Sequence, residues 1–155
     1  MILGIDCSSK VIAIAGIYKD GNFFTKVCTS TKKDWRSRYE NLFKEFNEVF
    51  NNLTDVQAVF IEDVPFVQNR QSFAKLLRIV SVCEQSCIKN NIPYFAVNNK
   101  TWKAQLIGDG NVSKESIKNF ALLSFGDIIN SLTGDEIDAL CLGRFGLLHL
   151  YQKFS

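Results

Sequence analysis

The first 30 residues contain three short apolar segments separated by turn sequences. The segments cover residues 2–6, 11–18 and 23–30, and Lys19-Asp20-Gly21-Asn22 between the last two is a strong hairpin signal. Consecutive strands joined by tight turns pair antiparallel. The chain therefore begins as a three-stranded antiparallel sheet, which the elements that follow have to cover.

The hydrophobic period changes from that of a strand to that of a helix after Asp34, a suitable N-cap. Large apolar residues from Trp35 to Leu53 follow helical spacing, which predicts a helix that covers the sheet. Further strands are expected at 57–61 and 93–97, and further helices at 69–90, 99–107, 113–125 and 133 to about 153. The order β-β-β-α-β-α-β-α-α-α predicts one α/β domain over residues 1–155, with a mixed five-stranded sheet (three antiparallel plus two parallel strands) flanked by helices.

Charge is distributed unevenly along the chain. The formal net charge is only +2, but residues 64–104 carry six basic side chains and a single acidic one, Glu84. A basic middle segment between acidic flanks is suited to a polyanion such as nucleic acid. A solvated helix face with scattered lysines explains the same excess.

The sequence shows no feature of export or of membrane insertion. The five cysteines form no C-x-x-C pair, no basic leader precedes the apolar start, and no run of about 18 apolar residues occurs. We therefore expect reduced thiols, no membrane association and a cytoplasmic location, which is the host cytoplasm if the protein is viral.

Two carboxylates stand at predicted strand ends. Asp6 ends the first strand and Glu62 ends the fourth. In open α/β sheets, sites form beyond the ends of strands, so these two side chains are expected to meet. An aspartate after an apolar strand is also a common turn residue.

A third acidic group lies in the first turns of the last helix. Thr133 and Glu136 have the spacing of a capping box, which assigns Glu136 to the helix start. Asp135 and Asp138 are then three positions apart on one side of the helix, where its dipole stabilises acids. Because three acids within four residues repel one another, a divalent cation is favoured, and oxygen ligands without a nearby histidine indicate Mg²⁺ or Mn²⁺. Paired ions of this kind support phosphodiester hydrolysis.

Three short motifs resemble those of the RuvC family of Holliday junction resolvases, which have an RNase H-like fold. They are Gly4-Ile5-Asp6, Phe60-Ile61-Glu62 and Asp135-x-x-Asp138-Ala139-Leu140, and their spacing fits along essentially the whole chain. The segment from Asn98 to Gly110, followed by Ser113-Lys114, resembles the basic segment of the family. Cys7-Ser8 replaces the usual Pro-Gly after the first aspartate. This divergence and the short chain resemble a phage or other viral member.

The resemblance implies a homodimer that binds a four-way DNA junction and nicks two opposing strands, a reaction of DNA recombination and repair. It implies two Mg²⁺ ions per active site, with Mn²⁺ able to substitute, held by the catalytic residues Asp6, Glu62, Asp135 and Asp138. Candidate DNA contacts are Phe66 as a wedge that stacks on a base, together with Arg70, Lys100, Lys103, Lys114 and Lys118. Core packing explains Phe66 equally well, and helix 69–90 is suited either to the dimer interface or to covering the sheet.

Other functions are compatible with parts of the same pattern. Sugar kinases share the opening Gly-Ile-Asp pattern, but they need a second domain, and no G-x-x-x-x-G-K-[ST] loop is present. A nuclease for RNA–DNA hybrids or structured RNA on the same fold, a branched-DNA nuclease that prefers forks and flaps, and a non-catalytic branched-DNA-binding module remain as alternatives.

Overall fold

The computed structural model describes residues 1–65 and 68–151. Strands β1 (Ile2–Cys7), β2 (Val11–Ile17) and β3 (Phe23–Thr29) form the expected antiparallel meander. Strands β4 (Ala58–Glu62) and β5 (Tyr94–Val97) extend the sheet parallel to β1, in the order β3-β2-β1-β4-β5. The predicted mixed five-stranded sheet is confirmed.

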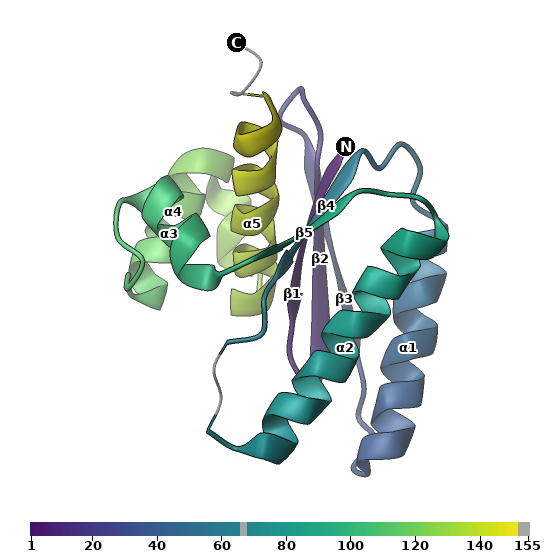
Figure 1. Cartoon of the computed structure of the whole chain (residues 1–155). Coiled ribbons are helices and arrows are strands. Elements are labelled where there is room, and N and C mark those ends of the chain that lie inside the picture. Colours follow the sequence, from purple (N-terminus) through teal and green to yellow (C-terminus); the bar gives the residue numbers. More distant parts are fainter. Residues whose placement is uncertain (66–67, 152–155) are drawn as a thin grey trace.

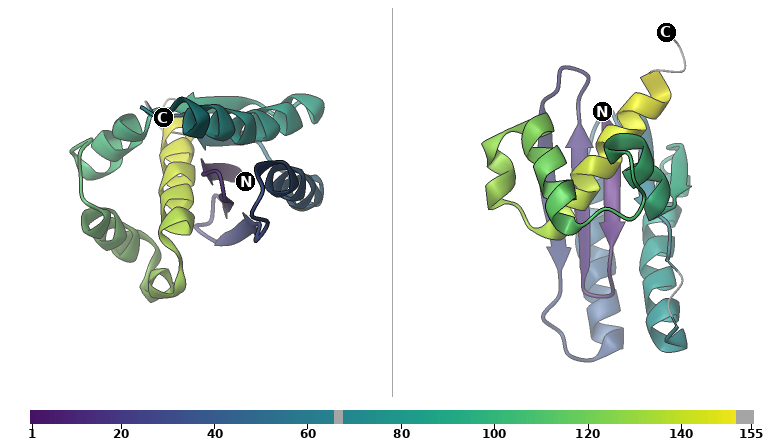
Figure 2. Two further views of the ribbon diagram at one scale, coloured as in Figure 1. Left: turned by 90° about the horizontal axis from the view of Figure 1, so that it is seen from below. Right: turned by 90° about the vertical axis from the view of Figure 1, so that its left-hand side faces the viewer.

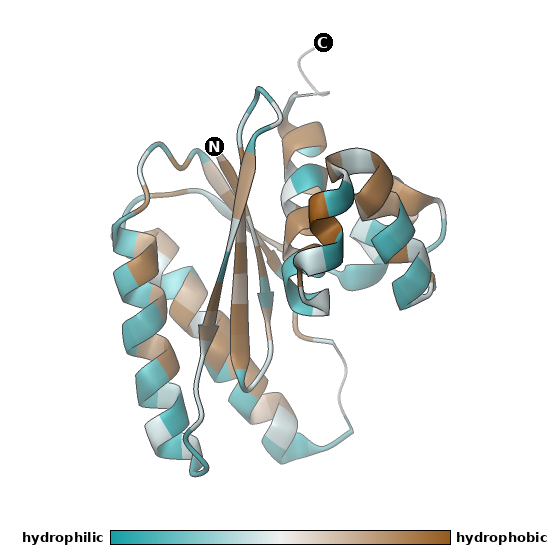
Figure 3. Ribbon diagram, turned by 180° about the vertical axis from the view of Figure 1, so that it is seen from behind, coloured by the Kyte–Doolittle hydropathy of each residue, from teal (hydrophilic) through white to brown (hydrophobic). Residues whose placement is uncertain are grey.

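The helices form layers on both faces of this sheet (Figures 1 and 2). Helices α1 (Trp35–Asn51) and α2 (Arg70–Lys89) cover one face. Helix α5 (Gly134–Tyr151) covers the other, with α3 (Asn99–Ile107) and α4 (Lys114–Phe125) outside it. Figure 3 shows the hydrophobic residues concentrated in the central strands. None of the described helices is both long and apolar enough to cross a membrane.

Local signals in the sequence explain most element boundaries. The backbone N–H of Ser37 donates to Asp34 Oδ1 at 2.8 Å, which confirms Asp34 as the N-cap of α1. The predicted hairpin turn places Gly21 at φ 91°, a conformation that favours glycine. A short 3-10 helix, η1 (Asp127–Ser131), was not expected from the sequence. The expected end of the last helix, at about residue 153, lies outside the described residues.

Candidate functional site

Asp6 and Glu62 lie side by side at the C-terminal ends of neighbouring strands. Ile5 of β1 pairs with Ile61 of β4 in the parallel register, so the residues that follow them occupy adjacent positions. Helix α5 runs in the opposite direction to β1, and its N-terminal end lies at the same edge of the sheet (Figure 1). Four carboxylates from three separate parts of the chain therefore lie near one another at the same end of the sheet.

Glycines allow α5 to approach the sheet closely enough for this meeting. A Cβ atom at Gly4 would lie 2.0 Å from the carbonyl oxygen of Ala139 and 2.4 Å from the nitrogen of Gly143. One turn further along α5, a Cβ atom at Gly146 would lie 2.3 Å from the ring of Phe60. The backbones of β1 and α5 are thus in direct contact, which no larger residue at Gly4 permits.

The first turn of α5 is fixed by the predicted capping box. Glu136 Oε2 accepts from the backbone N–H and the hydroxyl of Thr133, both at 2.8 Å, and Thr133 Oγ1 accepts from the Glu136 N–H at 3.3 Å. Thr25 of β3 adds a hydrogen bond to Glu136 Oε1 at 2.8 Å. Burial raises the pKa of Glu136, but these hydrogen bonds outweigh it, and the net pKa is lowered. Glu136 therefore caps the helix start, as the sequence predicted, and Thr25 also ties it to the sheet, which the sequence did not predict.

Burial and neighbouring negative charges raise the pKa values of two of the remaining carboxylates. Burial and then the negative charges of Glu62, Asp138 and Asp135 raise the pKa of Asp6 to about 8. Burial and then Glu62 raise the pKa of Asp138 to about 6, while the positive charges of Lys103 and Lys114 oppose that rise. All four predicted acids thus interact through their charges. A cation among them would relieve the repulsion, and an all-oxygen donor set fits a hard divalent ion.

The acidic side chains do not converge on one point. Within residues 1–65 and 68–151, no group of three or more His, Cys, Asp or Glu side chains is arranged so that it could hold a metal ion as it stands. Repulsion between the negatively charged carboxylates favours keeping them apart. The four acids adjoin one another but do not form a closed coordination shell.

Three of the predicted lysines border the acidic cluster. Lys103 on α3 and Lys114 on α4 act electrostatically on Asp138. Lys114 and Lys118 line a cleft of about 220 Å³ whose wall also includes Asp135 and Asp138. A negative cluster rimmed by lysines is suited to a phosphate group that approaches a bound cation.

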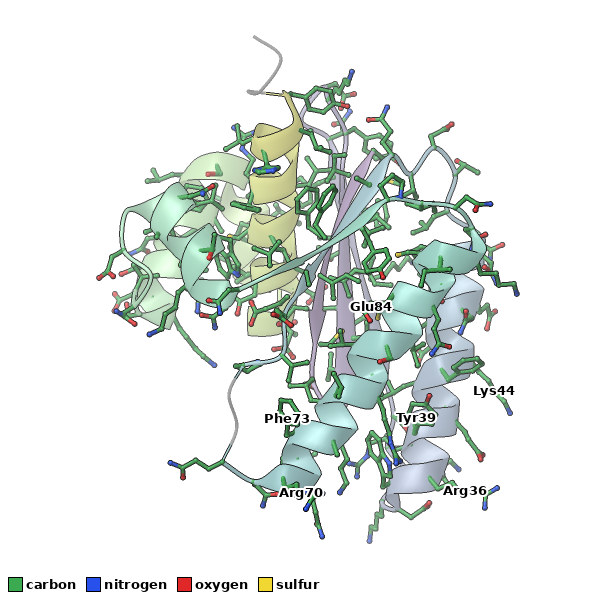
Figure 4. The ribbon with its side chains drawn as sticks, in the orientation of Figure 1. Arg36, Tyr39, Lys44, Arg70, Phe73 and Glu84 are labelled. Atoms are coloured by element: carbon green, nitrogen blue, oxygen red, sulfur yellow. The ribbon has the colours of Figure 1, made fainter. Side chains whose placement is uncertain are left out.

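The other predicted DNA contacts lie elsewhere or are not described. Lys100 is exposed in the first turn of α3. Arg70 is exposed at the first turn of α2, across the sheet from α3 and α4 and at the end of the molecule away from the termini (Figure 4). Phe66 lies outside the described residues.

Sequence reasoning missed one contact of the site. Trp102 on α3 donates its indole N–H to Glu62 Oε2 at 3.0 Å. The only available signal was a tryptophan inside a basic segment, immediately before Lys103. Since the two partners are 40 residues apart, the sequence alone does not connect them.

A groove larger than the cleft beside the acids lies away from this site. Its volume is about 620 Å³, and it lies between β2, β3 and α1. Its lining contains none of the predicted site residues. Large pockets are the usual first choice for a binding site. Here the charge cluster at the strand ends is the better candidate, because burial and like charges shift the pKa of two of its groups.

Comparison with known proteins finds relatives that match most of the chain. No family model matches the chain. The crossover junction endodeoxyribonuclease RuvC of Chlamydia abortus is 29% identical over 150 residues, an alignment that covers 92% of this chain and 90% of the relative. The chain is similar to RuvC proteins along nearly its whole length. The RuvC of Geotalea uraniireducens is 26% identical over 148 residues, 91% of this chain and 84% of the relative.

Solved structures show that this chain has the fold of RuvC, which is an RNase H-like fold. Thermus thermophilus RuvC in complex with a Holliday junction substrate matches with a TM-score of 0.82 and 16% identity, covering 98% of this chain and 95% of that one. The yeast mitochondrial Holliday junction resolvase matches with a TM-score of 0.52 and 14% identity, covering 99% of this chain and 83% of that one. The resemblance seen in the three motifs is therefore confirmed for family and fold.

Proposed function

We propose that this protein is a divalent-metal-dependent endonuclease that resolves four-way DNA junctions by paired nicks. The proposal rests on one observation. Four carboxylates from β1, β4 and α5 lie near one another at the C-terminal ends of β1 and β4, beside lysines of α3 and α4. The names of the curated relatives and of the solved junction complex give independent support.

The metal ligands of this proposal are Asp6, Glu62, Asp135 and Asp138. Mg²⁺ suits their oxygen atoms, Mn²⁺ is expected to substitute, and two ions per site are expected. When bound, such ions activate a water molecule for attack on phosphorus and neutralise charge on the leaving oxygen. Binding requires the carboxylates to lose their protons, so the raised pKa of Asp6 makes metal binding and proton release a coupled step.

The lysines hold the DNA backbone in this scheme. Lys103, Lys114 and Lys118 surround the acids and pair with the phosphates on either side of the scissile bond, because a cluster of carboxylates alone would repel DNA. Exposed Lys100 and Arg70 extend the contact to more distant phosphates. Phe66 keeps its proposed role as the wedge at the junction.

A homodimer is also proposed, with α2 as its interface. The apolar residues of α2 divide into two sets. Val80 is 4% exposed and Leu76 packs on the core, whereas Phe73 and Leu77 are 37% and 45% exposed. The first set covers the sheet and the second leaves an apolar strip for a second copy. Two sites related by a dyad are suited to a junction whose arms share that dyad. The viral origin and cytoplasmic location expected from the sequence stay predictions.

A cleavage assay on synthetic four-way junctions tests the proposal. Each strand is labelled in turn, and the products are separated on denaturing gels after incubation with Mg²⁺, Mn²⁺ or a chelator. Linear duplex, fork, flap and RNA–DNA hybrid substrates are run beside the junction. We expect paired nicks on opposing strands of the junction, which the chelator abolishes.

The other substrates and the divalent metals distinguish the alternative functions from one another. Cutting mainly of forks and flaps would indicate a broader branched-DNA nuclease, and cutting of hybrids alone would indicate an RNase. Junction binding without cleavage in any divalent metal would indicate a binding module. Each of these results contradicts junction resolution.

A further inference from the structure

The indole ring of Trp102 is fully buried in the apolar cluster beneath α5 and contacts Glu62. Its exposed fraction is 0%, and its N–H donates to Glu62 Oε2 at 3.0 Å. A buried indole N–H needs an acceptor, and the structure gives it a carboxylate oxygen of a proposed metal ligand. Core packing explains why the ring is buried, but it does not explain why the indole N–H is paired with Glu62.

The same ring also contacts a lysine of the proposed phosphate track. The ammonium group of Lys103 lies over the ring, 5.3 Å from its centroid. The charge of Lys103 in turn lowers the pKa of Asp138 against the effect of burial. One side chain therefore connects Glu62 on β4 with the basic residue on α3 that faces Asp138.

We propose that Trp102 is a positioning residue that orients Glu62 for metal binding. The hydrogen bond engages one lone pair of Oε2 and so fixes the orientation in which the carboxylate can meet an ion. It also restricts rotation of the carboxylate, so less freedom is lost when the metal binds. This inference rests on the proposed metal-dependent function. It adds Trp102 to the site as a residue that supports a metal ligand without being one of the four acids or one of the lysines.

The substitution that isolates the hydrogen bond is Trp102→Phe, which keeps an aromatic ring and removes the N–H. Partners that orient a metal ligand typically change metal affinity by about 10-fold to 100-fold when they are removed. We expect the variant to bind Mg²⁺ about 10-fold more weakly in calorimetry. Its cleavage rate should require a correspondingly higher Mg²⁺ concentration for half-saturation and should recover at high concentration.

The matched control is Trp35→Phe, which changes the other tryptophan of the chain, on α1 and across the sheet. Its Mg²⁺ affinity should equal that of the unmodified chain. Junction binding in chelator should be the same for all three proteins, since the indole N–H meets no phosphate. Equal Mg²⁺ affinity in Trp102→Phe and the unmodified chain would overturn the inference.

A second measurement uses the folded chain without any change at Trp102. In the Trp35→Phe chain, Trp102 is the only source of indole fluorescence. Mg²⁺ that binds Glu62 should shift this emission, and Glu62→Gln should abolish the shift. No shift at saturating Mg²⁺ would overturn the inference, even if Trp102→Phe fails to fold. Absence of both metal binding and cleavage in the unmodified chain would instead refute the proposed function.

Discussion

The two faces of the sheet are packed in different ways. On the face covered by α1 and α2, large side chains such as Phe46, Phe50 and Ile79 fill the space between layers. On the face covered by α5, Gly4 lies in direct contact with the α5 backbone. The first arrangement tolerates small shifts of a helix, whereas the second fixes α5 and so the acids at its N-terminal end. The α5 face therefore positions the site, whereas the α1/α2 face contributes to stability without fixing the acids.

Loss of one acid should have the largest effect on cleavage. Asp6→Asn removes a proposed metal ligand, so we expect junction cleavage to fall by at least roughly 100-fold, more than a partner outside the ligand set would cost. Junction binding should persist or tighten, because a negative charge is lost. The measurement is single-turnover cleavage beside a binding assay.

The matched control is Asp63→Asn. Asp63 is exposed and directly follows Glu62, so it shares the strand end without belonging to the cluster. Its cleavage rate should stay within a few-fold of the unmodified chain. Full turnover by Asp6→Asn would show that the cluster is not the metal site.

The contrast between the two faces is tested by Gly4→Ala and Phe46→Leu. The first adds a methyl group where the backbone of α5 leaves no space, and we expect a loss of stability of about 2 kcal/mol or more together with a large loss of cleavage. The second creates a small cavity under α1 and should cost about 1–2 kcal/mol with little change in cleavage by the folded fraction.

Thermal unfolding and single-turnover cleavage below the melting temperature provide the comparison for these two variants. If Phe46→Leu reduced cleavage as much as Gly4→Ala at equal folded fraction, the division of roles between the two faces would be wrong.

The stability of the metal-free chain should fall as pH rises from about 4 to about 8. In this window the folded chain keeps a proton on Asp6, whose pKa is about 8, while the unfolded chain has released it. The folded state is therefore favoured at the acidic end, and Asp138 acts in the same direction up to about pH 6.

Differential scanning calorimetry in chelator and in excess Mg²⁺ measures this trend. Added Mg²⁺ should stabilise the chain more at pH 8 than at pH 5, since binding needs the ionised carboxylates. The Asp6→Asn variant should show a flatter pH profile. A metal-free chain that becomes more stable towards pH 8 would contradict the account of the cluster.

The smallest effect is expected at the rim of the site. Lys114→Ala removes one proposed phosphate contact, so junction affinity should fall modestly and the slope of log affinity against log salt should decrease by about 1. Lys44→Ala is the control, since Figure 4 shows that Lys44 projects from α1 on the side away from α2. An unchanged slope for Lys114→Ala would remove α4 from the phosphate track.

Sequence patterns predicted the parts of the site that depend on strand ends and on helix caps. Asp6 and Glu62 follow apolar strands, and the Thr133–Glu136 spacing located the start of α5. Those features are local, so a single sequence contains them.

Contacts between distant segments were not predictable in the same way. Trp102 meets Glu62 only because α3 folds back beside β4, and Thr25 meets Glu136 across 111 residues. The 3-10 helix η1 is too short to show a periodic pattern. Helical spacing also did not show which apolar residues of α2 are buried, because Val80 and Phe73 follow the same pattern but differ in exposure.

We propose that the four carboxylates hold divalent metal. Anomalous diffraction from crystals grown with Mn²⁺ can locate the ions without reference to activity. We expect anomalous peaks bounded by Asp6 and Glu62 on one side and by Asp135 and Asp138 on the other. Saturating Mn²⁺ without a peak at these residues, or with peaks only elsewhere, would contradict this proposal.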